Sequence, residues 1–233
     1  MKKIITLLLT VLMVISLAGC GKKGGGDNPK PTPAPAPQPV EQKTVSRIGT
    51  DEDVEALLEA FNTKYRSWSA FYIDQEPEMG IMYYELWDDS DVYRGNYTKY
   101  LDHGLTPVSE LMVRYEDGEK TGPITHAYIF LPFEDITKVT EEQEEPLAEW
   151  GRMAVKALLP DLTEKQLSVL LDKIAVPDAE GFEAFATGYS DPSELETTRE
   201  DIYLTEDGEA AYTIGCTWDE EYQAILVEFE PKK

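Results

Sequence analysis

The sequence predicts an α+β domain in which helices pack on an antiparallel sheet. Three segments carry apolar residues at intervals of three and four, which is the spacing of one helix face. Other segments alternate between apolar and polar residues, and Asp-Gly pairs at 117–118 and 207–208 are strong hairpin signals. Hairpins that follow helices favour α+β over a parallel α/β sheet, whose strands need long crossover connections.

The chain begins with a segment, residues 1–19, that has the layout of a secretory signal peptide. Lys2 and Lys3 precede an apolar run that is too short to span a bilayer comfortably. The run ends in Leu17-Ala18-Gly19-Cys20, which closely resembles the lipobox of bacterial lipoproteins. The resemblance implies a lipid on the Cys20 thiol, cleavage before Cys20 and, in many species, an acyl chain such as palmitate on the new amino terminus. The alternative is an ordinary secretory signal with a chance cysteine.

Residues 20–46 form a tether between this anchor and the folded domain. Three glycines at 24–26 are followed by prolines at 29, 31, 33, 35, 37 and 39. Proline fixes φ and lacks an N–H, so the stretch favours an extended polyproline conformation and cannot nucleate a core. We interpret it as a spacer, with an SH3-type ligand as the alternative. The expected location is therefore the extracytoplasmic face of the cell membrane, held by the lipid alone.

Residues 47–233 form the folded part, as one domain or as two halves, 47–138 and 139–233. The chain has a formal net charge of −24, and most of its acidic residues lie in this part. Such a charge repels nucleic acid and anionic lipid, so neither is an expected partner. With Cys20 lipidated, Cys216 is the remaining thiol and no disulfide can form within the domain. The hydrophobic core must therefore carry the stability.

The first predicted helix follows Thr50, a plausible N-cap, with its apolar stripe running from Val54 to Trp68. The second starts at Thr140-Glu141-Glu142-Gln143, which is a capping-box pattern, and ends before Pro160. The third starts at a second capping box, Thr163-Glu164-Lys165-Gln166. The acidic residues at these helix starts are explained by the helix dipole.

Period-two segments predict the strands. They are Ala70–Asp74, Gly80–Trp87, Val92–Tyr97, Ser109–Tyr115, Thr125–Leu131, Phe182–Gly188, Asp201–Leu204, Ala210–Trp218 and Gln223–Phe229. Glu-Asp-Gly-Glu at 116–119 recurs at 206–209, and the starts of the first two helices match at the same offset. This echo raises the possibility of two repeated helix-plus-meander halves, although acidic turns also match by chance.

Motifs for catalysis and for cofactors are absent from the sequence. It has no phosphate-binding glycine loop, no G-x-S-x-G, no H-E-x-x-H and no C-x-x-C, so we expect no cofactor and no metal site. Residues 89–95 resemble a calcium loop but carry Arg94 where the loop needs glycine. Weak calcium binding by clustered carboxylates stays open.

Cys216 is the one candidate nucleophile. "TIGCT" at 213–217 faintly resembles the cysteine strand of sortase-type transpeptidases, with His126 as the base. Those enzymes need an arginine shortly after the cysteine, whereas the last arginine here is Arg199. Because Cys216 alternates with Ile214 on one strand face, we expect a buried thiol with little reactivity, and we assign no catalytic residue.

Aromatic residues crowd into the segment from Trp68 to Tyr100. Most of these rings could belong to the core, but an exposed Tyr and Trp surface is typical of glycan and protein binding sites. The predicted ligand-binding residues are Tyr93, Arg94, Asn96, Tyr97 and Tyr100.

We therefore expect a lipid-anchored, non-catalytic binding module for a wall glycan, a peptide or an envelope protein. A transporter's solute receptor is a weaker version of this hypothesis. The alternative is a carboxylate-dependent cell-wall hydrolase, with Glu85 beside Tyr83 and Trp87 as one example of an acid next to sugar-stacking rings.

Overall fold

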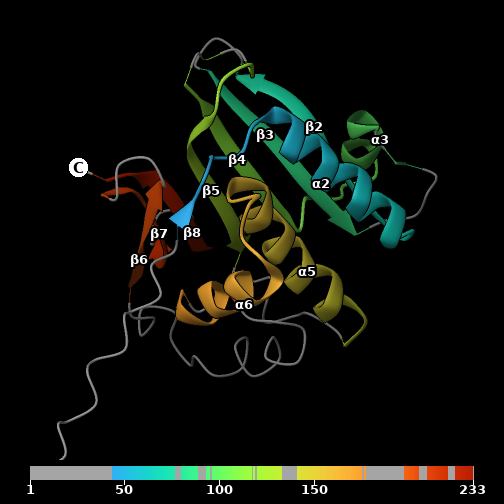
Figure 1. The fold of residues 1–233 in the computed structure, drawn as a ribbon. Coiled ribbons are helices and arrows are strands. Elements are labelled where there is room, and N and C mark those ends of the chain that lie inside the picture. The colour runs from blue at the N-terminus through green and yellow to red at the C-terminus, as the bar shows by residue number, and fades with distance from the viewer. Residues whose placement is uncertain are drawn as a thin grey trace, which may run out of the picture. The chain divides into compact units, whose positions relative to one another are not determined.

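The computed structural model describes residues 44–76, 80–88, 93–94, 96–116, 118, 120–132, 141–174, 176, 197–204, 209–219 and 224–232. Its centre is an eight-stranded sheet in the order β1-β6-β7-β8-β5-β4-β3-β2 (Figure 1). The strands are β1 (Thr44–Val45), β2 (Trp68–Glu76), β3 (Ile81–Asp88), β4 (Ser109–Tyr115), β5 (Ile124–Pro132), β6 (Thr198–Leu204), β7 (Ala210–Asp219) and β8 (Ala224–Pro231). Neighbouring strands are antiparallel, except that β1 runs parallel to β6.

Four helices accompany the sheet in the described ranges. They are α2 (Asp51–Lys64), α3 (Tyr97–Asp102), α5 (Glu141–Leu158) and α6 (Glu164–Lys173). The helices α2, α5 and α6 cover one face of the sheet (Figure 1), and their apolar stripes share one core with the strands beneath them. The predicted α+β class, with helices packed on an antiparallel sheet, is confirmed.

Buried side chains between the helices and the sheet hold α2 and α5 in place. On α2 the side chains of Val54, Leu57, Leu58 and Phe61 are buried, as the three-and-four spacing predicts. The ring of Phe61 meets that of Trp150 from α5 edge to face, with centroids 5.5 Å apart. These residues therefore join α2 and α5 directly above the sheet.

The helix starts follow the predicted capping chemistry. At α2 the Asp53 carboxylate accepts a hydrogen bond from the backbone N–H of Thr50 over 2.8 Å. At α6 the Thr163 hydroxyl accepts from the backbone N–H of Gln166, whose side chain accepts from the Thr163 N–H in return. The capping box predicted at Thr140 lies outside the described residues.

Two predictions about secondary structure are wrong. Val92–Tyr97 is not a strand, because Tyr93 and Arg94 lie in a turn and Asn96 caps α3 by accepting from the backbone N–H of Lys99. Trp68 does not belong to the first helix, which ends at Lys64, and instead begins β2. The predicted strand Phe182–Gly188 lies outside the described residues, as does most of the calcium-like segment 89–95.

The sheet joins two meanders. Strands β2 to β5 follow one another in space, as do β6 to β8, and the meanders meet where β5 pairs with β8. The two Asp-Gly signals fall between β4 and β5 and between β6 and β7, which are antiparallel neighbours as predicted. These two hairpins occupy different places in the sheet, and a duplication of halves 47–138 and 139–233 stays a prediction.

Candidate functional site

The sheet face away from α2, α5 and α6, here called the outer face, carries the candidate site. Directly paired residues on neighbouring strands point to the same face, so the strand register defines its rows. One row runs Phe71, Glu85, Glu110 and Phe130 across β2, β3, β4 and β5, and the next runs Ile73, Tyr83, Met112 and Tyr128. Tyr83, Met112, Tyr128 and Phe130 are partly exposed.

Helix α3 covers one end of the outer face. Its Tyr100 ring is fully buried and stacks on Trp87 of β3, with ring centroids 4.5 Å apart, and on Phe71 of β2 at 5.5 Å. Since Phe71 and Trp87 alternate with the core residues Ala70 and Leu86, α3 lies on the opposite side of the sheet from α2. Tyr100 therefore fixes this helix in place.

Two other predicted ligand residues have structural partners. The Arg94 guanidinium donates to the carbonyl oxygens of Asn62 at 3.1 Å and of Trp68 at 2.9 Å, so it fastens the turn to the end of α2 and the start of β2. Asn96 is the N-cap of α3. The structure thus supplies each of these polar groups with a bond inside the protein.

Tyr93 and Tyr97 are partly exposed beside the buried rings. The Tyr93 hydroxyl lies 3.1 Å from Nε2 of His103, on the surface of α3. Tyr97 meets Trp87 edge to face at 6.2 Å. Burial raises the pKa of the Tyr97 hydroxyl, and the charges of Glu85 and Glu110 raise it further.

Glu85 and Glu110 are directly paired residues on β3 and β4. Glu85 is 3% exposed, and its carboxylate accepts a hydrogen bond from Nε1 of Trp87 over 3.0 Å. Burial raises the pKa of the Glu110 carboxyl. Like charges directly opposite one another destabilise a sheet. This carboxylate pair, enclosed by aromatic rings, therefore needs an explanation other than stability.

A shallow cavity lies on the same face and begins one residue row beyond the carboxylate pair. It has a volume of about 180 Å³ and is lined by Ile81, Met112, Val113, Arg114, His126 and Tyr128. Arg114 pairs directly with His126, one row beyond Met112 and Tyr128. The outer face thus offers a small hollow that is lined by apolar side chains together with Arg114 and His126.

The sequence pointed to only one of the two paired glutamates. The sequence drew attention to Glu85 through its aromatic neighbours, but not to Glu110 on β4 or Tyr128 on β5. The signal for both is the alternation within the correctly predicted strands, which places them opposite the core residues. What the sequence could not supply was the register that sets Glu110 beside Glu85.

The cysteine is buried, as predicted. Cys216 is 1% exposed in the core between helices and sheet, and burial raises the pKa of its thiol to about 12. His126 lines the cavity on the outer face, so the two side chains lie on opposite sides of the sheet. A Cys216–His126 pair cannot form in this arrangement. Cys20, the predicted lipidation site, lies outside the described residues.

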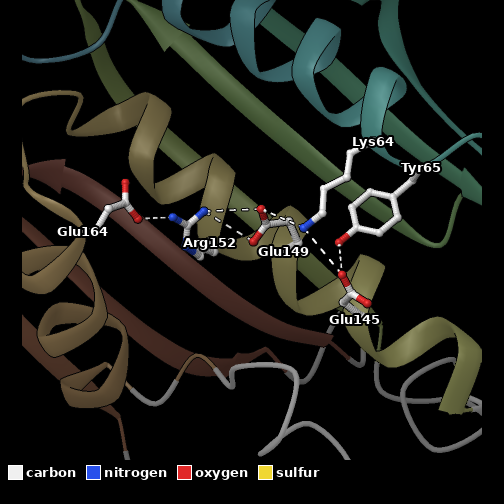
Figure 2. A network of polar contacts seen from close by, with 6 residues as sticks. All are labelled: Lys64, Tyr65, Glu145, Glu149, Arg152 and Glu164. Atoms are coloured by element: carbon white, nitrogen blue, oxygen red, sulfur yellow. Dashed lines mark hydrogen bonds and ion pairs between the residues drawn. The ribbon is translucent and has the colours of Figure 1, made fainter.

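A chain of polar contacts crosses the helical layer (Figure 2). Glu145 of α5 accepts from the Tyr65 hydroxyl at 3.0 Å, and Lys64 lies 3.5 Å from Glu145 and 3.4 Å from Glu149. Arg152 bridges Glu149 and Glu164 of α6. These two cations and three carboxylates are partly or largely exposed, so their contacts link α2, α5 and α6 but contribute only modestly to stability.

The described ranges contain neither a metal site nor a membrane-spanning helix. No three His, Cys, Asp or Glu side chains within them gather as a metal site requires. None of the helices described is long and apolar enough to cross a membrane. No family model, curated protein or solved structure matches the chain.

Proposed function

We propose that this protein is a lipid-anchored binding module on the extracytoplasmic face of a bacterial membrane, and that its outer face binds a wall glycan. The observation that carries the proposal is the half-buried Glu110, beside the buried Glu85, on a face that also carries partly exposed rings such as Tyr128 and Phe130. Sugar rings present C–H faces that stack on Tyr and Trp, and hydroxyls that donate to carboxylates. Both complementary groups occur together on this face.

The location rests on the sequence alone. The signal layout, the lipobox-like Leu17–Cys20 and the proline-rich tether together support a domain held at a distance from the bilayer. A strongly acidic domain also suits this place, because self-repulsion keeps it soluble at a crowded surface.

Photo-crosslinking in native cells tests the recognition face. A benzoylphenylalanine replaces Tyr97 in the full-length anchored protein, and the matched control places it at the exposed Lys165 on α6, on the helical side of the sheet. We expect an adduct at position 97 that is sensitive to wall-degrading enzymes, and none at 165. A protein-sized adduct that survives such digestion would assign a protein ligand instead, and equal adducts at both positions would refute a specific face.

The second candidate function is a carboxylate-dependent hydrolase. It is favoured by the direct pairing of Glu85 and Glu110, together with the raised pKa of Glu110, because a glycosidase uses two nearby carboxyl groups of which one stays protonated. The full-length protein is incubated with purified wall, and the release of sugar reducing ends is followed. Release that disappears in Glu110→Gln while wall binding persists would establish the hydrolase; binding without release supports the binding module.

A further inference from the structure

A second groove lies on the helical side of the molecule, between α2 and the edge strand β2. The sheet order ends at β2, so in the described sheet no further strand pairs with it. The groove has a volume of about 640 Å³, and its apolar lining includes Ala56, Leu58 and Tyr72. Of the outer-face rows described above, only Phe71 also lines this groove.

The acidic side of the groove is a stripe on α2. Glu52, Glu55 and Glu59 follow at intervals of three and four residues, so their exposed carboxylates lie along one line with ~4.5–6 Å of helix rise between neighbours. Like charges at this spacing oppose helix formation. Among the described residues, Glu55 and Glu59 form neither a hydrogen bond nor an ion pair. Asp53 on the same helix differs, because it pairs with Arg47 at 2.6 Å.

One end of the groove already holds an ammonium group, contributed by the protein itself. Nζ of Lys120 lies 3.5 Å from Oδ1 of Asp51 and 3.7 Å from the centroid of the Tyr72 ring, with the Tyr84 ring at 5.4 Å. Asp51 and Tyr72 both line the groove. A carboxylate beside a ring face is a favourable environment for a cation, and this contact shows that the groove surface supplies one.

The backbone of β2 limits how an occupant can bind. The Asn62 side chain donates to the carbonyl oxygen of Ala70 at 2.6 Å and accepts from the Ala70 N–H at 2.9 Å. The guanidinium of Arg94 donates a hydrogen bond to the carbonyl oxygen of Trp68. Side chains thus satisfy the edge at these two residues, which guards a strand against unwanted pairing. At these two residues an occupant is therefore recognised through its side chains and not through backbone pairing.

We propose that the groove between α2 and β2 is a docking site for an extended basic segment of another protein, with lysine or arginine at alternate positions. Side chains on one side of an extended chain recur every ~7 Å, which lets successive cations reach successive glutamates of the stripe. The open groove and the exposed carboxylates favour a segment whose own protein covers the surface, since small ligands are bound in enclosed pockets.

The test uses the full-length protein in detergent and a fluorescein-labelled heptapeptide of alternating glycine and lysine. We expect saturable binding, measured by anisotropy, that weakens steeply as salt rises from ~0.05 to ~0.5 M. Glu55→Gln combined with Glu59→Gln lowers the affinity about tenfold, the sum of two exposed ion pairs. The matched control, Glu116→Gln with Glu209→Gln, removes the same charge at exposed positions that do not line the groove and leaves the affinity unchanged.

Three outcomes would overturn this proposal. Absence of peptide binding or an equal loss in both double variants would show that the groove is not a specific site. Spermidine binding as tightly as the peptide, with the same dependence on Glu55 and Glu59, would assign a small polyamine instead. Tyr128→Ala on the outer face separates the two proposals, because it leaves peptide binding intact and weakens wall binding.

Discussion

At the scale of single residues, the atoms around Gly49 leave no room for a side chain. Its N–H donates to the carbonyl of Leu158 at 2.9 Å, and its own carbonyl accepts from the N–H of Ile124 at 2.8 Å. A Cβ at this position would lie 1.9 Å from the carbonyl oxygen of Ala157. The residue thus threads between the end of α5 and the start of β5, where only a glycine fits.

Gly49→Ala should therefore destabilise the protein by about 3 kcal/mol, because the clash is with backbone and cannot be relieved by a rotamer change. Urea unfolding followed by circular dichroism measures the change. Gly104→Ala is the control: it has a positive φ of 69° but nothing within 4 Å of the new Cβ, so only about 1 kcal/mol is expected. Equal losses in the two variants would contradict the close approach at Gly49.

Residue chemistry also shows where sequence reasoning reached its limit. The alternation around Cys216 was enough to predict a buried thiol, because its partner residues on the strand are apolar. Arg94 and Asn96 stood out as rare polar groups among aromatics, which suggested ligand binding. Their bonds go to backbone groups of Asn62, Trp68 and Lys99, and such partners cannot be identified from residue type or spacing.

At the scale of elements, the strands were predictable where both faces are regular. Ser109–Tyr115 is observed with the predicted bounds, since its core residues alternate without interruption. The prediction failed at 92–97, where Tyr93 and Tyr97 would lie on one face of a strand, whereas Asn96 is the N-cap of a helix. Local pattern could not decide this case, because α3 is held by tertiary stacking of Tyr100 on Trp87 and Phe71.

The burial of Glu110 on β4 predicts how the stability of the protein depends on pH. Burial raises the pKa of Glu110, so its ionised form is disfavoured in the folded state and the ionisation opposes folding at neutral pH. This penalty is absent below the pKa of the unfolded state, near ~4.3, and grows as pH rises through the folded pKa. Glu110→Gln should therefore raise the melting temperature at pH 7 and leave it almost unchanged at pH 4.

Melting curves of Glu110→Gln and the parent protein across this pH range test whether the substitution raises the melting temperature at pH 7. Glu116→Gln provides the control, because Glu116 is exposed and its substitution should leave the melting temperature nearly constant throughout. A Glu110→Gln protein that is less stable than its parent at pH 7 would show that the ionised carboxylate is stabilised by its surroundings.

At the scale of the whole molecule, the order of strands was beyond prediction. The hairpins follow from local turn signals, but the single sheet depends on the pairing of β5 with β8, whose residues are far apart in sequence. The alternation of apolar and polar residues in β5 and β8 does not indicate that these two strands pair with each other. The same long-range step creates the outer face as a continuous surface, since Tyr128 pairs with Met112 on one side and with Glu228 on the other.

The proposed membrane anchor also concerns the whole molecule, and the two cysteines allow a matched test. In native cells, Cys20→Ser should lower the membrane-bound fraction at least about tenfold, because more than one acyl chain is needed for stable attachment and this variant has none. Incorporation of labelled palmitate should disappear with it. Cys216→Ser should stay in the membrane fraction, because that side chain is buried in the core. A parent protein found in the medium would identify an ordinary secretory signal, and a Cys20→Ser protein still held by membranes would place the attachment elsewhere.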